Sequence, residues 1–276
     1  MSDLGRIAIV LVETSSPGNL GSVSRVMKNM GLDRLILVDC RADLTQEARQ
    51  RARGADDLLE KAVRTSGLGS ALESFHLSVA TSSRTVRWFD RSLQPREMAA
   101  KLNRLGPGHQ VAIVFGPERT GLTNEHLQYC HWQVRIPTAS GFPSLNLAHA
   151  VAIVAYELSQ GLSAPPCKGD RVLAELGQIE AFSQDLEGCL KEIQFLKKQN
   201  PQEVMMTLRQ MLARASLDNR DVRILRGILR QWKWYGRSKG IHEDSGGKAL
   251  STKGHERRRR DTKGLENTRK GYAKGE

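Results

Sequence analysis

The sequence predicts an α/β protein whose parallel sheet is covered by helices on both faces. Between residue 6 and about residue 160, short runs rich in β-branched residues alternate with segments of helical periodicity. This alternation is typical of β–α–β units, in which the strands pair in parallel. The segment 146–158 is apolar on almost every side. We therefore expect a helix that packs on the sheet with one face and on a second subunit with another.

Five runs have the length and composition of strands. They are RIAIVLVE (6–13), RLILVD (34–39), HLSVATS (76–82), VAIVFG (111–116) and WQVRIPT (132–138). After the first run, apolar residues recur at positions i, i+3, i+4 and i+7, which predicts a helix from Ser22 to Met30 that Gly31 closes. The stretch SPGNLG (16–21) before it is predicted to be a turn.

A strand, a glycine-containing turn and a helix make the usual layout of an anion site. The stretch SPGNLGSVSR (16–25), however, contains neither G-x-x-x-x-G-K-[ST] nor G-x-G-x-x-G. The sequence therefore disfavours a nucleotide phosphate loop and, with it, a Rossmann dehydrogenase.

The C-terminal part predicts a different organisation. The segment 161–170 has two adjacent prolines between glycines and is predicted to be a linker. Residues 171–236 predict a small helical extension, with helices at about 171–199, 202–214 and 219–234. Residues 237–276 carry twelve lysines and arginines against six acidic residues and few apolar ones, so we expect a disordered basic tail.

Composition limits the partners. The chain has 276 residues, a formal net charge of +12 and a pI near 9.8, which favours a polyanion such as RNA or an anionic membrane surface. No run reaches the roughly 18 to 20 apolar residues of a membrane helix, and we expect a cytoplasmic protein. The four cysteines are far apart and lack metal-ligand spacing, so we expect free thiols and no metal.

Three loops that follow predicted strands carry compact polar residues. They are TSSPGNLGSVSR (14–25), FGPERTGLTNE (115–125) and IPTASGFPSLNLAHAV (136–151). Any one of them fits plain turn chemistry. Because ligands of open parallel sheets sit beyond the carboxyl ends of the strands, the three together predict a site there.

These loops contain motifs that resemble those of the SPOUT methyltransferases, and among them the TrmH-like RNA ribose 2′-O-methyltransferases. The motifs are N-x-G-x-x-x-R at 19–25, G-x-E at 116–118 and S-L-N at 144–146. The segments 13–31, 81–84, 115–131 and 208–229 further resemble the bacterial TrmJ branch. The resemblance implies that residues 1–160 form a parallel-sheet SPOUT domain with a C-terminal trefoil knot, and it extends to about residue 230.

The resemblance also implies the roles of site residues. S-adenosylmethionine would be held by Thr81, Ser82, Ser83, Gly116, Ile136, Ser144, Leu145 and Asn146. The catalytic set would be Asn19, Arg25, Glu118, Ser144 and Asn146. Arg25 would be either the proton acceptor or a cation that stabilises the developing alkoxide. Gly18 and Gly21 would let the backbone approach RNA closely, and Ser144 alternatively caps the helix that follows.

RNA contacts are expected at Arg25 and Arg84 and on the last predicted helix. There a basic stripe lies opposite an apolar one; its members are Arg223, Arg226, Arg230 and Lys233. The stripe is either an ordinary solvated face or a phosphate-binding surface.

The expected function is that of a homodimeric enzyme that methylates a ribose of tRNA in the anticodon loop, at nucleotide 32. No further RNA-binding module precedes the first strand, which favours tRNA over ribosomal RNA. The alternatives are a ribosomal RNA 2′-O-methyltransferase of the same superfamily and a catalytically silent RNA-binding protein with the same fold.

Overall fold

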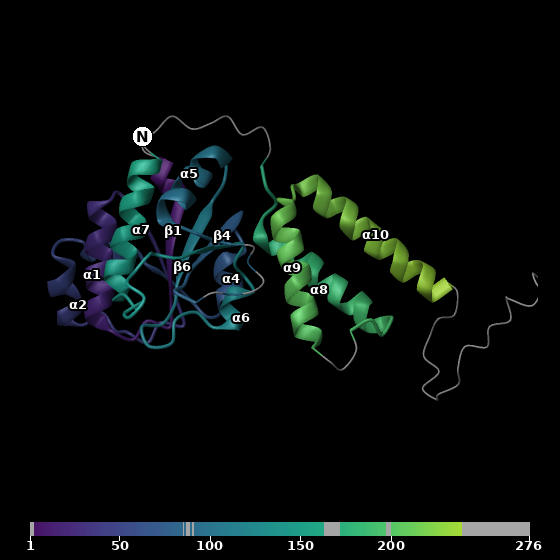
Figure 1. Cartoon of the computed structure of the whole chain (residues 1–276), viewed down its shortest axis with the longest axis horizontal. Coiled ribbons are helices and arrows are strands. Elements are labelled where there is room, and N and C mark those ends of the chain that lie inside the picture. The colour runs from purple at the N-terminus through teal and green to yellow at the C-terminus, as the bar shows by residue number, and fades with distance from the viewer. Residues whose placement is uncertain are drawn as a thin grey trace, which may run out of the picture. The chain divides into compact units, whose positions relative to one another are not determined.

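The protein is described by a computed structural model covering residues 3–84, 86, 89, 91–162, 172–196 and 200–238. Within these residues seven strands form one parallel sheet in the order β3-β2-β1-β6-β4-β7-β5 (Figure 1). They are β1 (Ile7–Val12), β2 (Arg34–Val38), β3 (Val63–Thr65), β4 (Leu77–Thr81), β5 (Ser92–Leu93), β6 (Val111–Phe115) and β7 (Trp132–Val134). The predicted α/β class and all five predicted strands are confirmed, whereas β3 and β5, the short edge strands, were not predicted.

Helices cover both faces of the sheet. Alternate residues of β1 point to opposite faces: Ile9 belongs to a core with α1 (Pro17–Asn29), α2 (Gln46–Ala52), α3 (Asp56–Lys61), α5 (Pro95–Leu105) and α7 (Leu147–Gly161). Val10 belongs to a second core with α4 (Leu68–Leu72) and α6 (Asn124–Leu127). Figure 1 shows α1 and α7 on one side of the sheet and α4 and α6 on the other. A short 3-10 helix, η1 (Asp3–Arg6), precedes β1.

The prediction of a turn at 16–21 was wrong, because α1 already begins at Pro17. Ser16 caps it by accepting a hydrogen bond from the Asn19 amide at 3.2 Å, and proline is favoured in the first helical turn. A Cβ on Gly21 would overlap the Ala48 carbonyl oxygen of α2, and one on Gly18 would meet the Glu47 carboxylate. Gly21 therefore permits close packing of α1 on α2, whereas Gly18 meets only side-chain ends of Glu47 and Arg51. The expectation that the two glycines let RNA approach stays a prediction.

Three further helices follow, α8 (Leu176–Glu192), α9 (Pro201–Ala215) and α10 (Asn219–Ser238). They share a small apolar cluster that includes Phe182 and Leu229. The Leu176 amide donates to the Phe75 carbonyl at 2.7 Å, and Met1–Lys233 form one compact unit, with Trp234–Glu276 as the other. The first of these helices is shorter than predicted, since it begins at Leu176 and ends at Glu192.

Some predictions lie outside what the structure describes. Of the predicted linker, residues 163–170 are not among the described residues, and the same holds for the tail from residue 239. The trefoil knot stays a prediction. No helix among the described residues is long and apolar enough to span a membrane.

The packing of Gly21 gives a stability prediction. We expect Gly21→Ala to lower the free energy of unfolding by about 1–3 kcal/mol, because the added methyl group overlaps α2 backbone. The control is Gly188→Ala in the middle of α8, where an added Cβ meets nothing within 4 Å. There alanine is expected to stabilise by about 0.5–1 kcal/mol. Urea unfolding of both variants measures the difference, and equal effects would contradict the packing role.

A partly buried histidine gives a pH prediction. The Nδ1 atom of His131 lies 2.9 Å from the Ser78 hydroxyl, and burial lowers the pKa of His131 to about 4. As pH falls from about 6.5 to about 4, the unfolded chain binds a proton that the folded protein does not. Stability is therefore lost over that range, by at most about 1.4 kcal/mol per pH unit from this group. We expect His131→Gln to make urea denaturation midpoints less dependent on pH between about 6.5 and 4. An unchanged pH dependence would contradict the role of His131.

Candidate active site

A pocket opens at the carboxyl ends of β4, β6 and β7, where a parallel sheet is expected to bind ligands. Its walls come from residues 81–84, 115–121 and 134–150. Seven of the eight residues predicted to hold the cofactor line it: Thr81, Ser82, Ser83, Gly116, Ile136, Ser144 and Leu145. The eighth, Asn146, directly follows them. The pocket thus brings together two of the three predicted loops, 115–125 and 136–151, with residues 81–84 as its third wall.

The lining combines two kinds of group. Val134, Ile136 and Leu147 supply apolar surface, while Ser82 and Ser144 supply hydroxyls. Apolar side chains suit the flat face of an adenine ring, and hydroxyls with loop backbone suit the ribose and amino-acid ends of S-adenosylmethionine. The residues present therefore fit this cofactor. The part of the chain that the structure describes holds no cluster of three potential metal-binding side chains.

Three motifs meet in a chain of hydrogen bonds beside the pocket. Asn146 Nδ2 donates to Asn19 Oδ1 at 2.9 Å, and Asn19 Nδ2 donates to Glu118 Oε1 at 3.1 Å. Asn146 Oδ1 also accepts from the Ala148 amide at 2.9 Å, so Asn146 caps α7. The alternative that Ser144 is the cap was wrong. We call this chain of three side chains the asparagine relay.

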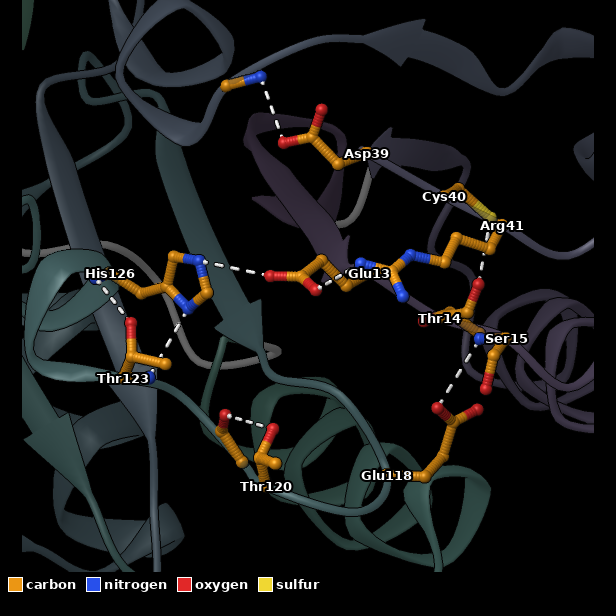
Figure 2. A network of polar contacts seen from close by, with 12 residues as sticks. Glu13, Thr14, Ser15, Asp39, Cys40, Arg41, Glu118, Thr120, Thr123 and His126 are labelled. Carbon is orange, nitrogen blue, oxygen red and sulfur yellow. Dashed lines mark hydrogen bonds and ion pairs between the residues drawn. The ribbon is translucent and has the colours of Figure 1, made fainter.

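Glu118 holds the loop that leads into α1. One carboxylate oxygen accepts from the Ser15 amide at 3.4 Å (Figure 2). The other accepts from the Ser16 amide at 3.4 Å and from Asn19 Nδ2. A carboxylate near the first turn of a helix is also favoured by the helix dipole. All three contacts fix the position of α1 relative to the loop that follows β6.

A second charged group, which the sequence did not predict, lies near Glu118 (Figure 2). Glu13 follows β1 in a left-handed conformation with φ 51°. Its Oε2 accepts from Arg41 Nη2 at 3.1 Å, and its Oε1 lies 3.6 Å from His126 Nε2. The signal available in the sequence was the position of residues 13 and 41, each just after a buried strand. These contacts join the loops after β1 and β2 to α6.

Arg25 lies apart from the rest of the predicted catalytic set. It is exposed, it does not line the pocket, and it has no polar contact among the described residues. At about 100° per residue, positions 19 and 25 point to different sides of α1. One chain therefore places Asn19, Glu118, Ser144 and Asn146 together but leaves Arg25 outside.

Several residues expected to contact RNA bind protein groups instead. Arg84 donates to the Leu122 carbonyl at 3.3 Å and to Asn124 Oδ1 at 3.0 Å, bracing a wall of the pocket. On α10, Arg226 and Lys233 lie 3.4 and 3.8 Å from the Asp185 carboxylate.

The other two members of the predicted stripe differ. Arg223 Nε donates to the Asn219 carbonyl at 3.3 Å, and Arg230 has no polar partner among the described residues. The stripe is therefore only partly available for phosphate.

Comparison with known proteins matches this organisation. Residues 6–156 match the SpoU rRNA Methylase family, and residues 177–243 match the C-terminal domain of the tRNA methyltransferase TrmJ. A tRNA (cytidine/uridine-2′-O-)-methyltransferase TrmJ from Pectobacterium atrosepticum is 41% identical over 233 residues, covering 82% of this chain and 96% of that protein.

Two solved structures are similar as well. The crystal structure of TrmJ from Z. mobilis has a TM-score of 0.73 at 30% identity and covers 82% of this chain and 98% of its own. A probable methylase family protein from Haemophilus influenzae has a TM-score of 0.56 at 33% identity and covers 86% of this chain and 99% of its own. With the pocket and the asparagine relay in place, these matches confirm the resemblance: this chain belongs to the SpoU methylase family and carries the C-terminal domain of its TrmJ members.

Proposed function

We propose that this protein is an S-adenosylmethionine-dependent tRNA 2′-O-methyltransferase that acts in the cytoplasm on cytidine or uridine at nucleotide 32 of the anticodon loop. The observation that carries the proposal is the asparagine relay, which joins three motifs beside a pocket suited to the cofactor. The name of the Pectobacterium relative, which aligns over 96% of its length, supports tRNA as the substrate.

The chemistry is a single displacement. When bound, S-adenosylmethionine supplies the methyl group: the ribose oxygen bonds to the methyl carbon, the carbon–sulfur bond breaks to leave a thioether, and the hydroxyl proton is lost to water. Ser144 and the backbone of 144–146 hold one wall of the pocket, while Glu118 and Asn19 act as positioning residues. Since all three contacts of Glu118 are with N–H donors, its carboxylate is engaged in structure.

We assign Arg25 the role of a cation that stabilises the alkoxide, because a guanidinium stays protonated in proteins and is a poor base. It acts in a homodimer, in which Arg25 of the partner subunit completes each site. Two observations support this: Arg25 does not line its own pocket, and α7 exposes Ile153 and Tyr156, as expected of a helix that packs on a second subunit.

A ribosomal RNA substrate is the second candidate, since the matching family model bears the name of rRNA methylases. A silent RNA-binding protein is disfavoured because the relay and the pocket are both intact.

The first test is transfer of a labelled methyl group to tRNA and to ribosomal RNA, followed by mapping of the modified nucleotide. We expect transfer to a 2′-oxygen of tRNA and a loss of about 100-fold or more in Arg25→Ala, because a charge-stabilising group is removed. Arg104→Ala, an exposed arginine at the end of α5, is the control and retains activity. Transfer to ribosomal RNA alone would show that the substrate is ribosomal RNA rather than tRNA. Transfer to neither RNA would contradict the proposed methyltransferase activity.

The shared site gives a second prediction. We expect Arg25→Ala and Asn146→Ala to be nearly inactive alone, yet to regain transfer when the two variants are co-expressed as mixed dimers. In such a dimer one site combines an intact relay with an intact Arg25. No recovery in mixed dimers isolated by two different tags would show that each chain uses its own Arg25.

A further inference from the structure

The loop 116–122 forms one lip of the pocket and is held rigidly. A Cβ on Gly116 would overlap the backbone of Leu122, so the two ends of the loop are in close contact. The Gly121 amide donates to the Pro117 carbonyl at 2.9 Å, and Gly121 has a φ of 64°, which favours glycine. Arg84 Nη1 donates to the Leu122 carbonyl at 3.3 Å, at the end of the loop. The tip of this loop therefore has a fixed position.

Arg119 stands at that tip as an exposed side chain lining the pocket. Its guanidinium has no hydrogen bond or ion pair among the described residues, whereas Arg84, which lines the same pocket, and Arg41, in the loop after β2, both have protein partners. The neighbouring acid, Glu118, is turned to Ser15, Ser16 and Asn19. The lip of the pocket thus presents a positive charge that nothing in the described chain neutralises, and arginine is well suited to bind phosphate through paired N–H groups.

We propose that Arg119 binds the RNA phosphate on the 3′ side of the target ribose and so positions the 2′-oxygen for methyl transfer. This inference rests on the proposed function. The 2′-oxygen and the 3′-phosphate are attached to neighbouring carbons of the ribose. A nucleotide whose 2′-oxygen points into the pocket therefore places that phosphate at the lip, where Arg119 lies. Arg119 is a positioning residue in this role, because it does not touch the reacting atoms.

The carboxylate of S-adenosylmethionine is the other anion that Arg119 could bind. The lining inside the pocket already offers hydroxyls and backbone groups to that end of the cofactor, and Arg119 lies at the exposed rim. The two sources are separated by measuring cofactor and RNA binding independently.

The test is a double-mutant cycle on binding, which needs no turnover. Wild-type protein, Arg119→Ala and Arg119→Lys are titrated with an anticodon stem-loop, and with the same RNA carrying a neutral methylphosphonate 3′ to the nucleotide that wild-type enzyme methylates. We expect the methylphosphonate to weaken wild-type binding about tenfold, which is about 1.4 kcal/mol. It should have little further effect on Arg119→Ala, while Arg119→Lys keeps part of the sensitivity. Additive effects of the RNA and protein changes would overturn the proposal.

Salt dependence gives an independent readout. Removing one phosphate contact is expected to reduce the slope of log affinity against log salt by about 0.7–0.9. The control is Arg104→Ala, an exposed arginine in the last turn of α5, which should leave this slope unchanged. In the absence of RNA, Arg119→Ala should bind S-adenosylmethionine with the wild-type affinity. A weaker cofactor affinity with an unchanged slope would assign Arg119 to the cofactor carboxylate and overturn the phosphate contact.

The outcomes also separate this inference from the proposed function. If wild-type protein methylates no tRNA, the proposed function fails whatever Arg119 does. If wild-type protein methylates tRNA and Arg119→Ala binds the stem-loop with unchanged affinity and slope, only the present inference fails.

Discussion

The geometry of the site depends on the hydrogen bonds that join Glu118, Asn19 and Asn146. These residues are far apart along the chain and belong to the loop after β6, the first turn of α1 and the cap of α7. Glu118 also accepts from the amides of Ser15 and Ser16, and Asn146 accepts from that of Ala148, while the Asn19 side chain bridges the two. Loss of Glu118 or Asn146 would therefore release a helix end as well as a partner, and such coupling holds the elements at fixed positions around the pocket.

The sheet was predictable because its central strands are apolar on both faces. β1 is buried at every position, as expected of a parallel strand between two helical layers. The strands that were missed, β3 and β5, are only three and two residues long and lie at the sheet edges, so they have no such run. The sequence predicts too late a start for α1, because Gly18 and Gly21 are residues typical of turns. At position 21 the reason for glycine is the backbone of α2, a contact that periodicity within α1 does not reveal.

The pocket residues came from the resemblance of short motifs, and the structure places seven of the eight on one surface. Spacing along the sequence predicted less well which arginines and lysines are available to bind phosphate. Arg226 and Lys233 fit a helical stripe, yet both face Asp185, and Arg84 braces the pocket wall. The partner of an arginine depends on contacts between distant segments, so a one-dimensional pattern of positive charge overstates the surface available to phosphate.

Cations with protein partners and cations without them have different consequences for RNA binding. An arginine already paired with a carboxylate must lose that contact before it binds phosphate, so its net gain is small. An arginine at the tip of a rigid loop has no such pair to break, and little of its backbone freedom remains to be lost on binding. By this criterion Arg119 is better prepared to bind phosphate than Arg41, whose guanidinium lies 3.1 Å from the Glu13 carboxylate. The asparagine relay fixes Glu118, and Arg119 directly follows Glu118 in the chain. The position of Arg119 relative to the pocket therefore depends on the same three hydrogen-bonded side chains.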